Sequence, residues 1–202
     1  MATATTELEA GNVMLAAIGE APINSLTGTL PVDARMAQTT LNEINKDVQS
    51  EGWHFNTEID VVLTRDPATE QVALASNVLR VDPNIYQHPS IDAVQIGLKL
   101  YDRQNHKYEF DEDLTCVVVY FRTFTEIPEP ARRYVMIKAA RIFVDRLVGD
   151  EGLRSYTQQD EIRARAILME TDASNADHNI LRGDPSLTNV FSTYLPANGL
   201  IR

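Results

Sequence analysis

The sequence predicts an α+β protein in which a four-helix bundle carries an inserted small antiparallel β domain and ends in an extended C-terminal arm. Apolar residues recur at helical spacing in residues 1–56 and again in 126–178, which together would form the bundle. In residues 57–125 the apolar spacing changes to two, which is typical of strands. Residues 179–202 combine large apolar side chains with turn-forming residues, so we expect an arm that packs on another surface.

Two helices are expected before the β-rich insertion. The first spans about Thr6–Gly19, since glycine is a common helix stop and Pro22 prevents continuation. The second begins near Asp33, the expected N-cap, and Gly52 ends it. Its apolar stripe falls at steps of four, three and four residues: Ala37, Leu41, Ile44 and Val48.

The insertion contains several strand patterns. Short strands are expected around Glu58–Thr64 and Val78–Val81. Lys107–Phe110 should form the returning strand of a hairpin whose loop is Asp102–His106, and Leu114–Phe124 should be the central strand of the sheet. A regular alternation predicts one buried sheet face formed by Val94, Ile96, Leu98 and Leu100.

Helical spacing returns after Pro128 and Pro130. The third helix should close at Gly149, and the fourth should span about Glu151–Ala176. The third helix has one apolar stripe, formed by Ile137, Ala140, Val144 and Leu147. The fourth has a weaker one, formed by Leu153, Tyr156, Ala164 and Ile167. Its many charged residues predict a solvated or subunit-facing surface.

Composition excludes several classes of function. The formal net charge of −11 argues against a surface that grips DNA, although an acidic wall suits a conduit through which DNA slides. No apolar run is long enough to span a bilayer, and the N-terminus does not resemble a signal peptide, so we expect folding in a cytoplasm. The single cysteine, Cys116, lies in an apolar run and is interpreted as a core residue.

The sequence contains no recognisable motif for catalysis or metal binding. The four histidines show no ligand spacing, and no phosphate-binding loop or nucleophile elbow is present, so we expect no catalytic residue, metal or cofactor. The acidic run formed by Glu109, Asp111, Glu112 and Asp113 is interpreted as a solvated loop. Its alternative interpretation is the carboxylate pair of a virion-associated glycan hydrolase.

Charged residues on the two late helices are explained by ion pairing. Arg163 and Arg165 lie beside Asp160 and Glu161, which predicts local pairs along one helix. The basic residues of both helices are also interpreted as partners in salt bridges between helices or between subunits, rather than as phosphate contacts: Arg132, Arg133, Lys138, Arg141, Arg154, Arg163 and Arg165.

Five sequence blocks, in order along the chain, resemble the tail tubular protein A family, the head-to-tail adaptors of short-tailed phages. The strongest is LNEINKDVQSEGWHFNTE, which includes Asn45, Gln49, Gly52, Trp53 and Asn56. The other blocks are LAAIGEAPINSL (15–26), LKLYDRQNHKYEF (98–110), IPEPARRYVMIKAARIF (127–143) and NILRGD (179–184) with the terminal GLIR.

The resemblance implies a structural virion protein rather than an enzyme, assembled in the host cytoplasm and located at the head-tail junction. Twelve copies would form a ring under the portal protein, receive the tail nozzle (tail tubular protein B) below, and lie near the tail fibres. DNA would pass through the lumen without specific binding, and no membrane would be involved. The Tyr101, Asp102 and Arg103 hairpin would contact the nozzle or a neighbouring subunit.

The C-terminal arm would grip the portal. Large apolar side chains on a segment rich in turn-forming residues need a partner surface. We therefore expect four anchors in the arm: Leu187, Phe191, Tyr194 and Leu195. Two other classes of function stay open beside the adaptor, namely the glycan hydrolase and a generic binding module.

Overall fold

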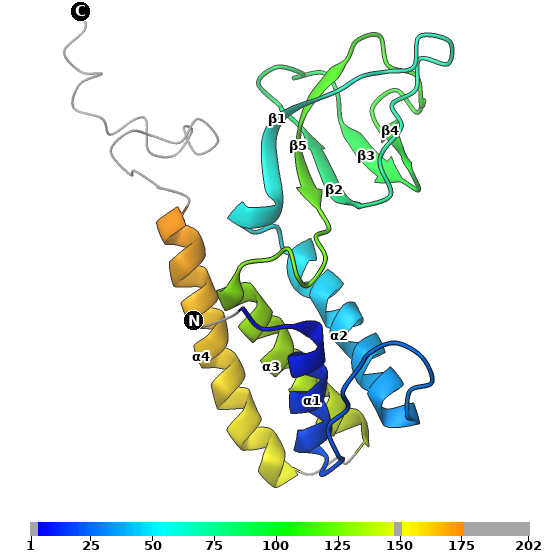
Figure 1. Ribbon diagram of the computed structural model, residues 1–202. Helices are drawn as coiled ribbons and strands as arrows, with labels where there is room; N and C mark the ends of the chain where they lie inside the picture. Colours follow the sequence, from blue (N-terminus) through cyan, green and yellow to red (C-terminus); the bar gives the residue numbers. More distant parts are fainter. Residues whose placement is uncertain (1–3, 148–150, 176–202) are drawn as a thin grey trace, which may run out of the picture.

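A computed structural model of the chain describes residues 4–147 and 151–175. The fold is α+β, with the helices gathered at one end and the strands at the other (Figure 1). The helices are α1 (Glu7–Ala17), α2 (Val32–Ser50), α3 (Glu129–Leu147) and α4 (Glu151–Asn175), and a short 3-10 turn, η1, covers His54–Asn56. The strands are β1 (Thr57–Leu63), β2 (Val78–Pro83), β3 (Ala93–Ile96), β4 (Lys99–Asp102) and β5 (Leu114–Tyr120).

The helix ends follow from local sequence, with one correction. Thr6 caps α1 through a reciprocal capping box with Glu9, and Gly19 follows the helix at a φ of 82°, as expected for a glycine stop. The expectation that Asp33 caps α2 is wrong, because Pro31 occupies that position and no side chain caps the helix. Asp33 instead lies in the first turn, where a carboxylate is favoured by the helix dipole.

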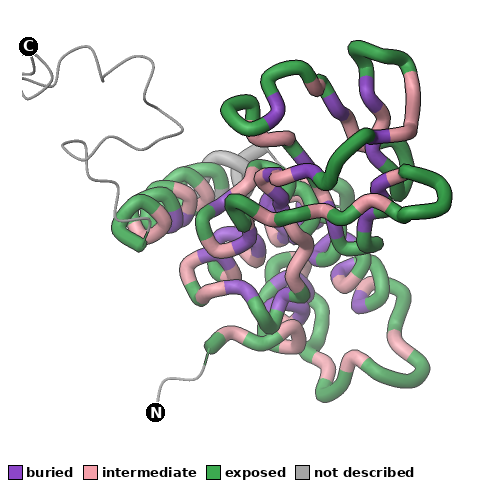
Figure 2. The backbone as a smooth tube through the Cα atoms, turned by 90° about the horizontal axis from the view of Figure 1, so that it is seen from above, coloured by how far each residue is buried: buried purple, intermediate pink, exposed green. Residues whose placement is uncertain are grey.

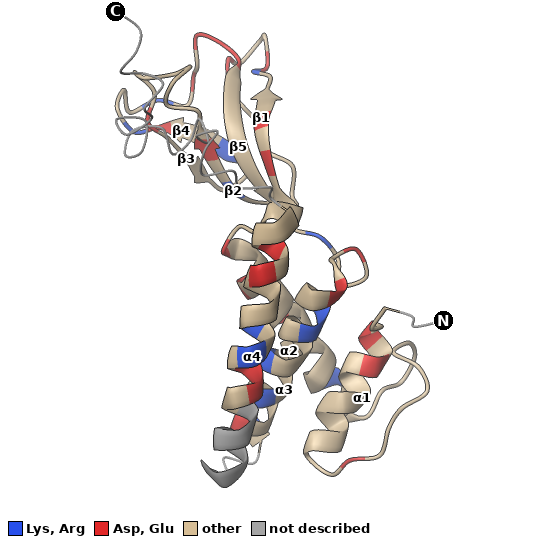
Figure 3. Cartoon of the chain, turned by 90° about the vertical axis from the view of Figure 1, so that its left-hand side faces the viewer, with Lys and Arg blue, Asp and Glu red and all other residues tan. Residues whose placement is uncertain are grey.

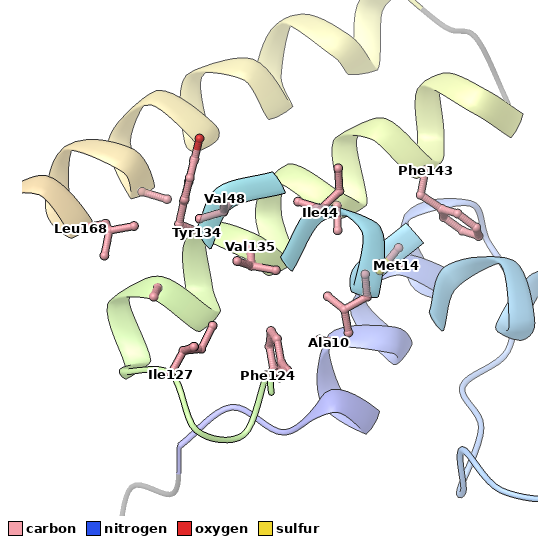
Figure 4. Close-up of a cluster of buried hydrophobic side chains, with 14 of the residues drawn as sticks. Ala10, Met14, Ile44, Val48, Phe124, Ile127, Tyr134, Val135, Phe143 and Leu168 are labelled. Carbon is pink, nitrogen blue, oxygen red and sulfur yellow. The ribbon is translucent and has the colours of Figure 1, made fainter. Parts of the chain in front are cut away.

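The helices share one apolar core, to which the loop before α3 also contributes (Figure 4). Helix α3 contacts each of the other three helices. Its buried face is not the predicted stripe, since Ile137 and Ala140 are only partly buried and Leu147 is exposed. A helix with neighbours on several sides buries a wider face than one stripe, and the residues of α3 that it buries are Ala131, Tyr134, Val135, Ala139, Phe143 and Val144.

Strand β5 is the centre of a three-stranded antiparallel sheet in the order β1-β5-β2, which confirms the prediction from its sequence. Both neighbours pair with it through a register irregularity, and in β1 this coincides with Asp60 at a φ of 56°. A second apolar core lies among the strands and their loops, apart from the helical core (Figure 2).

The alternation from Val94 to Leu100 does not form one strand with a single buried face. Gly97 adopts a φ of 63° and turns the chain between β3 and β4, which pair with each other. Consequently Ile96 and Leu98 are exposed at the turn, while Leu100 is fully buried. The expected second hairpin is reduced to a bridge between Asp102 and Lys107, so Lys107–Phe110 is not a strand.

In the portion of the chain that the structure describes, no helix has the length and apolar character needed to cross a membrane.

Candidate functional site

A buried polar network lies where the helices meet the sheet. Three side chains at the end of α2 and in η1 are almost inaccessible to solvent: Asn45, Gln49 and Asn56. Burying amide groups costs free energy unless each is hydrogen-bonded, so the network must be complete to be stable.

Gln49 joins α2 to the segment that follows β5. Its Oε1 accepts the backbone N–H of Arg122 at 2.8 Å, and its Nε2 donates to the carbonyl of the same residue at 2.8 Å. The Nε2 also donates to Asn45 Oδ1 at 2.8 Å, and Asn45 Nδ2 donates to the Arg122 carbonyl at 3.3 Å. The end of the central strand is therefore fixed to the last turns of α2.

Asn56 and Trp53 fix the other connection between the helices and the sheet, where the chain passes from α2 through η1 into β1. Asn56 Nδ2 donates to the carbonyls of Gln49 and Tyr120, both at 3.0 Å, and its Oδ1 accepts the N–H of Trp53 at 2.8 Å. The Trp53 indole Nε1 donates to the carbonyl of Val48 at 2.7 Å. These contacts make both connections between the helices and the sheet rigid.

Gly52 allows the tight turn inside this network. Its φ is 80°, and a Cβ placed there would lie 2.7 Å from Arg80 Nη2. The strongest sequence block, Leu41–Glu58, thus contains the residues that build the junction. The sequence pattern did not predict their shared network, because Tyr120 and Arg122, whose backbone groups they bind, are distant in sequence.

Ion pairs attach α4 to the rest of the helices, and Figure 3 shows acidic and basic residues along these helices. Arg165 binds the Glu51 carboxylate at 3.1 and 2.9 Å, donates to Tyr134 Oη at 3.3 Å, and lies over the rings of Trp53 and Tyr134. Arg141 pairs with Glu161 across α3 and α4. Arg165 and Glu161, both on α4, therefore pair with other elements. This confirms the expected salt bridges between helices for Arg165, whereas local pairing along α4 is not what these two residues form.

The interpretation of the late basic residues as salt-bridge partners is confirmed for Lys138, which binds Asp47 at 2.6 Å, and for Arg141. Hydrogen bonding to Glu161 raises the pKa of the Arg141 guanidinium. Arg132 instead donates to backbone carbonyls, among them those of Thr5 and Ile127. Asp172, near the end of α4, accepts the backbone N–H of His54 in η1 at 2.9 Å.

The Tyr101, Asp102 and Arg103 hairpin shows three different environments. Asp102 is buried, and its carboxylate accepts hydrogen bonds from Gln104 and Asn105 within its own turn. Burial opposes ionisation, yet these bonds hold the pKa of Asp102 below its ordinary value. Tyr101 packs edge-on against Tyr108, and Arg103 reaches Asp92 at 3.8 Å. A contact of this hairpin with a nozzle or neighbour stays a prediction.

The acidic residues after the hairpin bind different partners. Glu112 lies 2.8 Å from His88 Nδ1, and Asp113 accepts the backbone N–H of Arg65. Because His88 Nε2 accepts the N–H of Thr115, its Nδ1 carries the proton and donates to Glu112. A surface hollow of about 330 Å³ adjoins Glu109, Asp111 and Glu112. The arrangement supports local ion pairing and gives no sign of a dedicated acid–base pair.

Metal and thiol chemistry receive no support from the geometry. Residues 4–147 and 151–175 contain no group of three or more histidine, cysteine or carboxylate side chains placed to hold a metal ion. Cys116 is fully buried, and burial raises the pKa of its thiol to about 11, which leaves the unreactive thiol form at neutral pH. Its interpretation as a core residue is confirmed.

The expected portal anchors lie outside the described residues, so their role stays a prediction: Leu187, Phe191, Tyr194 and Leu195.

A family model described as Tube: Tail tubular protein matches residues 8–178, which include α1 from its second residue, the other three helices and all five strands of the structure. No protein with a curated description matches the chain.

Proposed function

The chain belongs to the tail tubular protein family of bacteriophage tail structural proteins, and we propose on that premise that it forms the adaptor ring between the portal and the tail nozzle. The observation that carries the proposal is the family match over residues 8–178. In this role twelve copies continue the DNA channel of the portal, and the genome leaves the head through their lumen. The protein then acts in the virion at the head-tail junction, after assembly in the host cytoplasm.

The proposed division of the chain assigns a task to each part. The helices, in residues 1–56 and 126–178, form a bundle that builds the ring wall. The inserted β domain, 57–125, faces the nozzle or the outer rim and carries the Tyr101–Arg103 hairpin. The arm, 179–202, grips the portal through its apolar anchors, so that the ring forms only where a portal serves as template.

The junction network supports this division physically. An adaptor must hold the portal and the nozzle in a fixed relative orientation. This requires a firm connection between the helices and the β domain of each copy. Here Gln49 and Asn56 tie both connections through buried hydrogen bonds. The net charge of −11 per copy also suits a lumen that repels phosphates and lets DNA slide.

The glycan hydrolase alternative gains no favouring observation. The acids that suggested it are engaged by partners of different kinds: Glu112 by a histidine, Asp113 by a backbone N–H and Asp111 by Lys107 at 3.6 Å. A glycosidase instead needs two carboxylates facing each other across a sugar.

Truncation of the arm tests the portal contact. The chain ending at residue 178 keeps every helix and strand of the structure. It should stay folded and soluble but should no longer co-sediment with rings of the cognate portal, whereas the full chain should. Co-sedimentation of the truncated chain at the level of the full chain would overturn the assignment of the arm.

A further inference from the structure

Within residues 158–175, helix α4 directs one face toward the other described elements of the subunit. Ala164 and Leu168 are buried in the helical core, and Glu161 and Arg165 pair with residues of other elements on the same side. On the side turned away from α3, four apolar residues are exposed at steps of four, three and four: Ile162, Ala166, Met169 and Ala173. Ile162 is 64% exposed and Met169 is 53% exposed, so this apolar stripe, the α4 stripe, has no partner among residues 4–147 and 151–175.

Helix α2 carries a second exposed apolar pair. Val32 is 72% exposed and Met36, one turn later, is 39% exposed. Both lie on the face of α2 opposite to the one that packs in the core, since Ala34, Ala37 and Leu41 are buried. We call Val32 and Met36, with the exposed Thr39 one turn further on, the α2 stripe.

The two stripes cannot meet within one subunit. Helix α3 packs against both α2 and α4, and Figure 1 shows α4 on one side of the helices and α2 on the other. One stripe therefore faces one flank of the subunit, and the other stripe faces the opposite flank. A second copy, placed beside the first, brings the α4 stripe of one against the α2 stripe of the other.

The charges beside the stripes fit such a contact. Arg163 and Glu170 flank the α4 stripe, and Asp33 and Arg35 flank the α2 stripe. None of these four side chains takes part in a salt bridge within the described portion of the chain. A face-to-face contact can therefore pair Arg163 with Asp33, which carry opposite charges.

We propose that the α4 stripe of one copy packs against the α2 stripe of the next copy and forms the lateral contact of the assembly. Because the two surfaces are different and face opposite flanks, the contact is heterologous, and repeated copies close into a ring when the rotation allows it. The inference rests on the proposed ring but names the contact that holds it together.

Cross-linking tests the contact directly. The variant Met36→Cys/Met169→Cys places one thiol in each stripe, while the native Cys116 is buried and does not compete. Assembled on cognate portal and treated with a short bismaleimide, it should give a ladder of covalent oligomers in denaturing gels. The matched control Met36→Cys/Ile167→Cys moves one thiol to the exposed Ile167, outside the α4 stripe, and should give little ladder.

Charge reversal gives a second, independent measurement. Arg163→Glu should raise the concentration needed for half-occupancy of the portal by about tenfold, because it places a carboxylate against Asp33. Asp33→Arg in the same chain should restore the wild-type concentration. This contact would be overturned if rings form on the portal but the double-cysteine variant gives no cross-linked oligomers and Asp33→Arg does not restore the assembly of Arg163→Glu. The adaptor function would still stand in that case. Failure of the wild-type chain to form rings on the portal would overturn the adaptor function and this contact together.

Discussion

The side chain of Gln49 and the backbone of Arg122 bind each other in both directions, with the Gln49 amide accepting the N–H and donating to the carbonyl, each at 2.8 Å. An amide side chain is a suitable partner, because it presents a donor and an acceptor side by side, as a neighbouring strand would. Gln49 thus satisfies the backbone of the chain at the point where it leaves β5 and no strand is present to pair with it.

Replacing Gln49 with leucine should destabilise the protein strongly. The substitution leaves the N–H of Arg122 without its partner and weakens the bonding of its carbonyl, so a loss of roughly 2–4 kcal/mol in the free energy of unfolding is expected. Urea denaturation followed by circular dichroism measures it. Asn42→Leu, at an exposed position of the same helix, is the matched control and should change stability by less than about 0.5 kcal/mol. Equal effects of the two substitutions would contradict the role given to Gln49.

Arg165→Lys tests the attachment of α4. Lysine keeps the positive charge but cannot bind the Glu51 carboxylate through two nitrogens while donating to Tyr134 and lying over Trp53. The expected loss is modest, about 1 kcal/mol, because the pair is partly solvated. Relative to the wild type, amide hydrogen exchange should accelerate more in α4 than in α3. A uniform increase over the whole chain would argue against a local attachment.

Asp172→Ala tests the contact between the end of α4 and η1. Without the carboxylate, the N–H of His54 loses its acceptor, and the last turns of α4 should exchange faster, at a cost of about 1 kcal/mol. Glu170→Ala, two residues away and exposed, removes a carboxylate without such a bond and should leave exchange in η1 unchanged. If both variants behave alike, general charge rather than the hydrogen bond is responsible.

Asp102→Asn should change how stability depends on pH. The folded state holds the pKa of Asp102 below its ordinary value, so the carboxylate contributes stability above that ordinary value and loses it as the pH falls through the folded pKa. The variant should therefore be less stable than the wild type by about 1–2 kcal/mol at pH 7, and the difference should shrink as the pH falls through the folded pKa. Denaturation over this pH range checks it.

The exposed Asp92 provides the control for that series, because Asp92→Asn should change stability by less than about 0.5 kcal/mol at every pH. A constant gap between wild type and Asp102→Asn at all pH values would mean that geometry, and not charge, stabilises the turn.

The sequence predicts some elements well because their signal is local. The apolar run of β5 is long and rich in valine, and such a composition alone is enough to predict a strand buried between two neighbours. The pattern from Val94 to Leu100 failed because the positive φ of Gly97 outweighs the alternation around it. The face of α3 was misplaced because three other helices, which no local pattern reveals, decide which of its residues are buried.

The candidate site was predictable only in part. Gln49, Trp53 and Asn56 stand together in one sequence block, but their partners at Tyr120 and Arg122 are far along the chain, and hydrogen bonds to a distant backbone leave no periodic trace. The exposed α4 stripe was not predicted, because the sequence indicated a charged outer surface for that helix. Of the predicted apolar face, Ala164 is buried but Ile167 is exposed. The apolar spacing of its outer face became clear only once the inner face was known.

The most direct measurement is to mix the full-length protein with its cognate portal, determine the mass of the product and image it by negative stain. The account predicts a twelve-fold ring stacked under the portal, with the free chain forming no such ring at the same concentration. A portal that stays bare in the presence of excess protein would contradict the adaptor function.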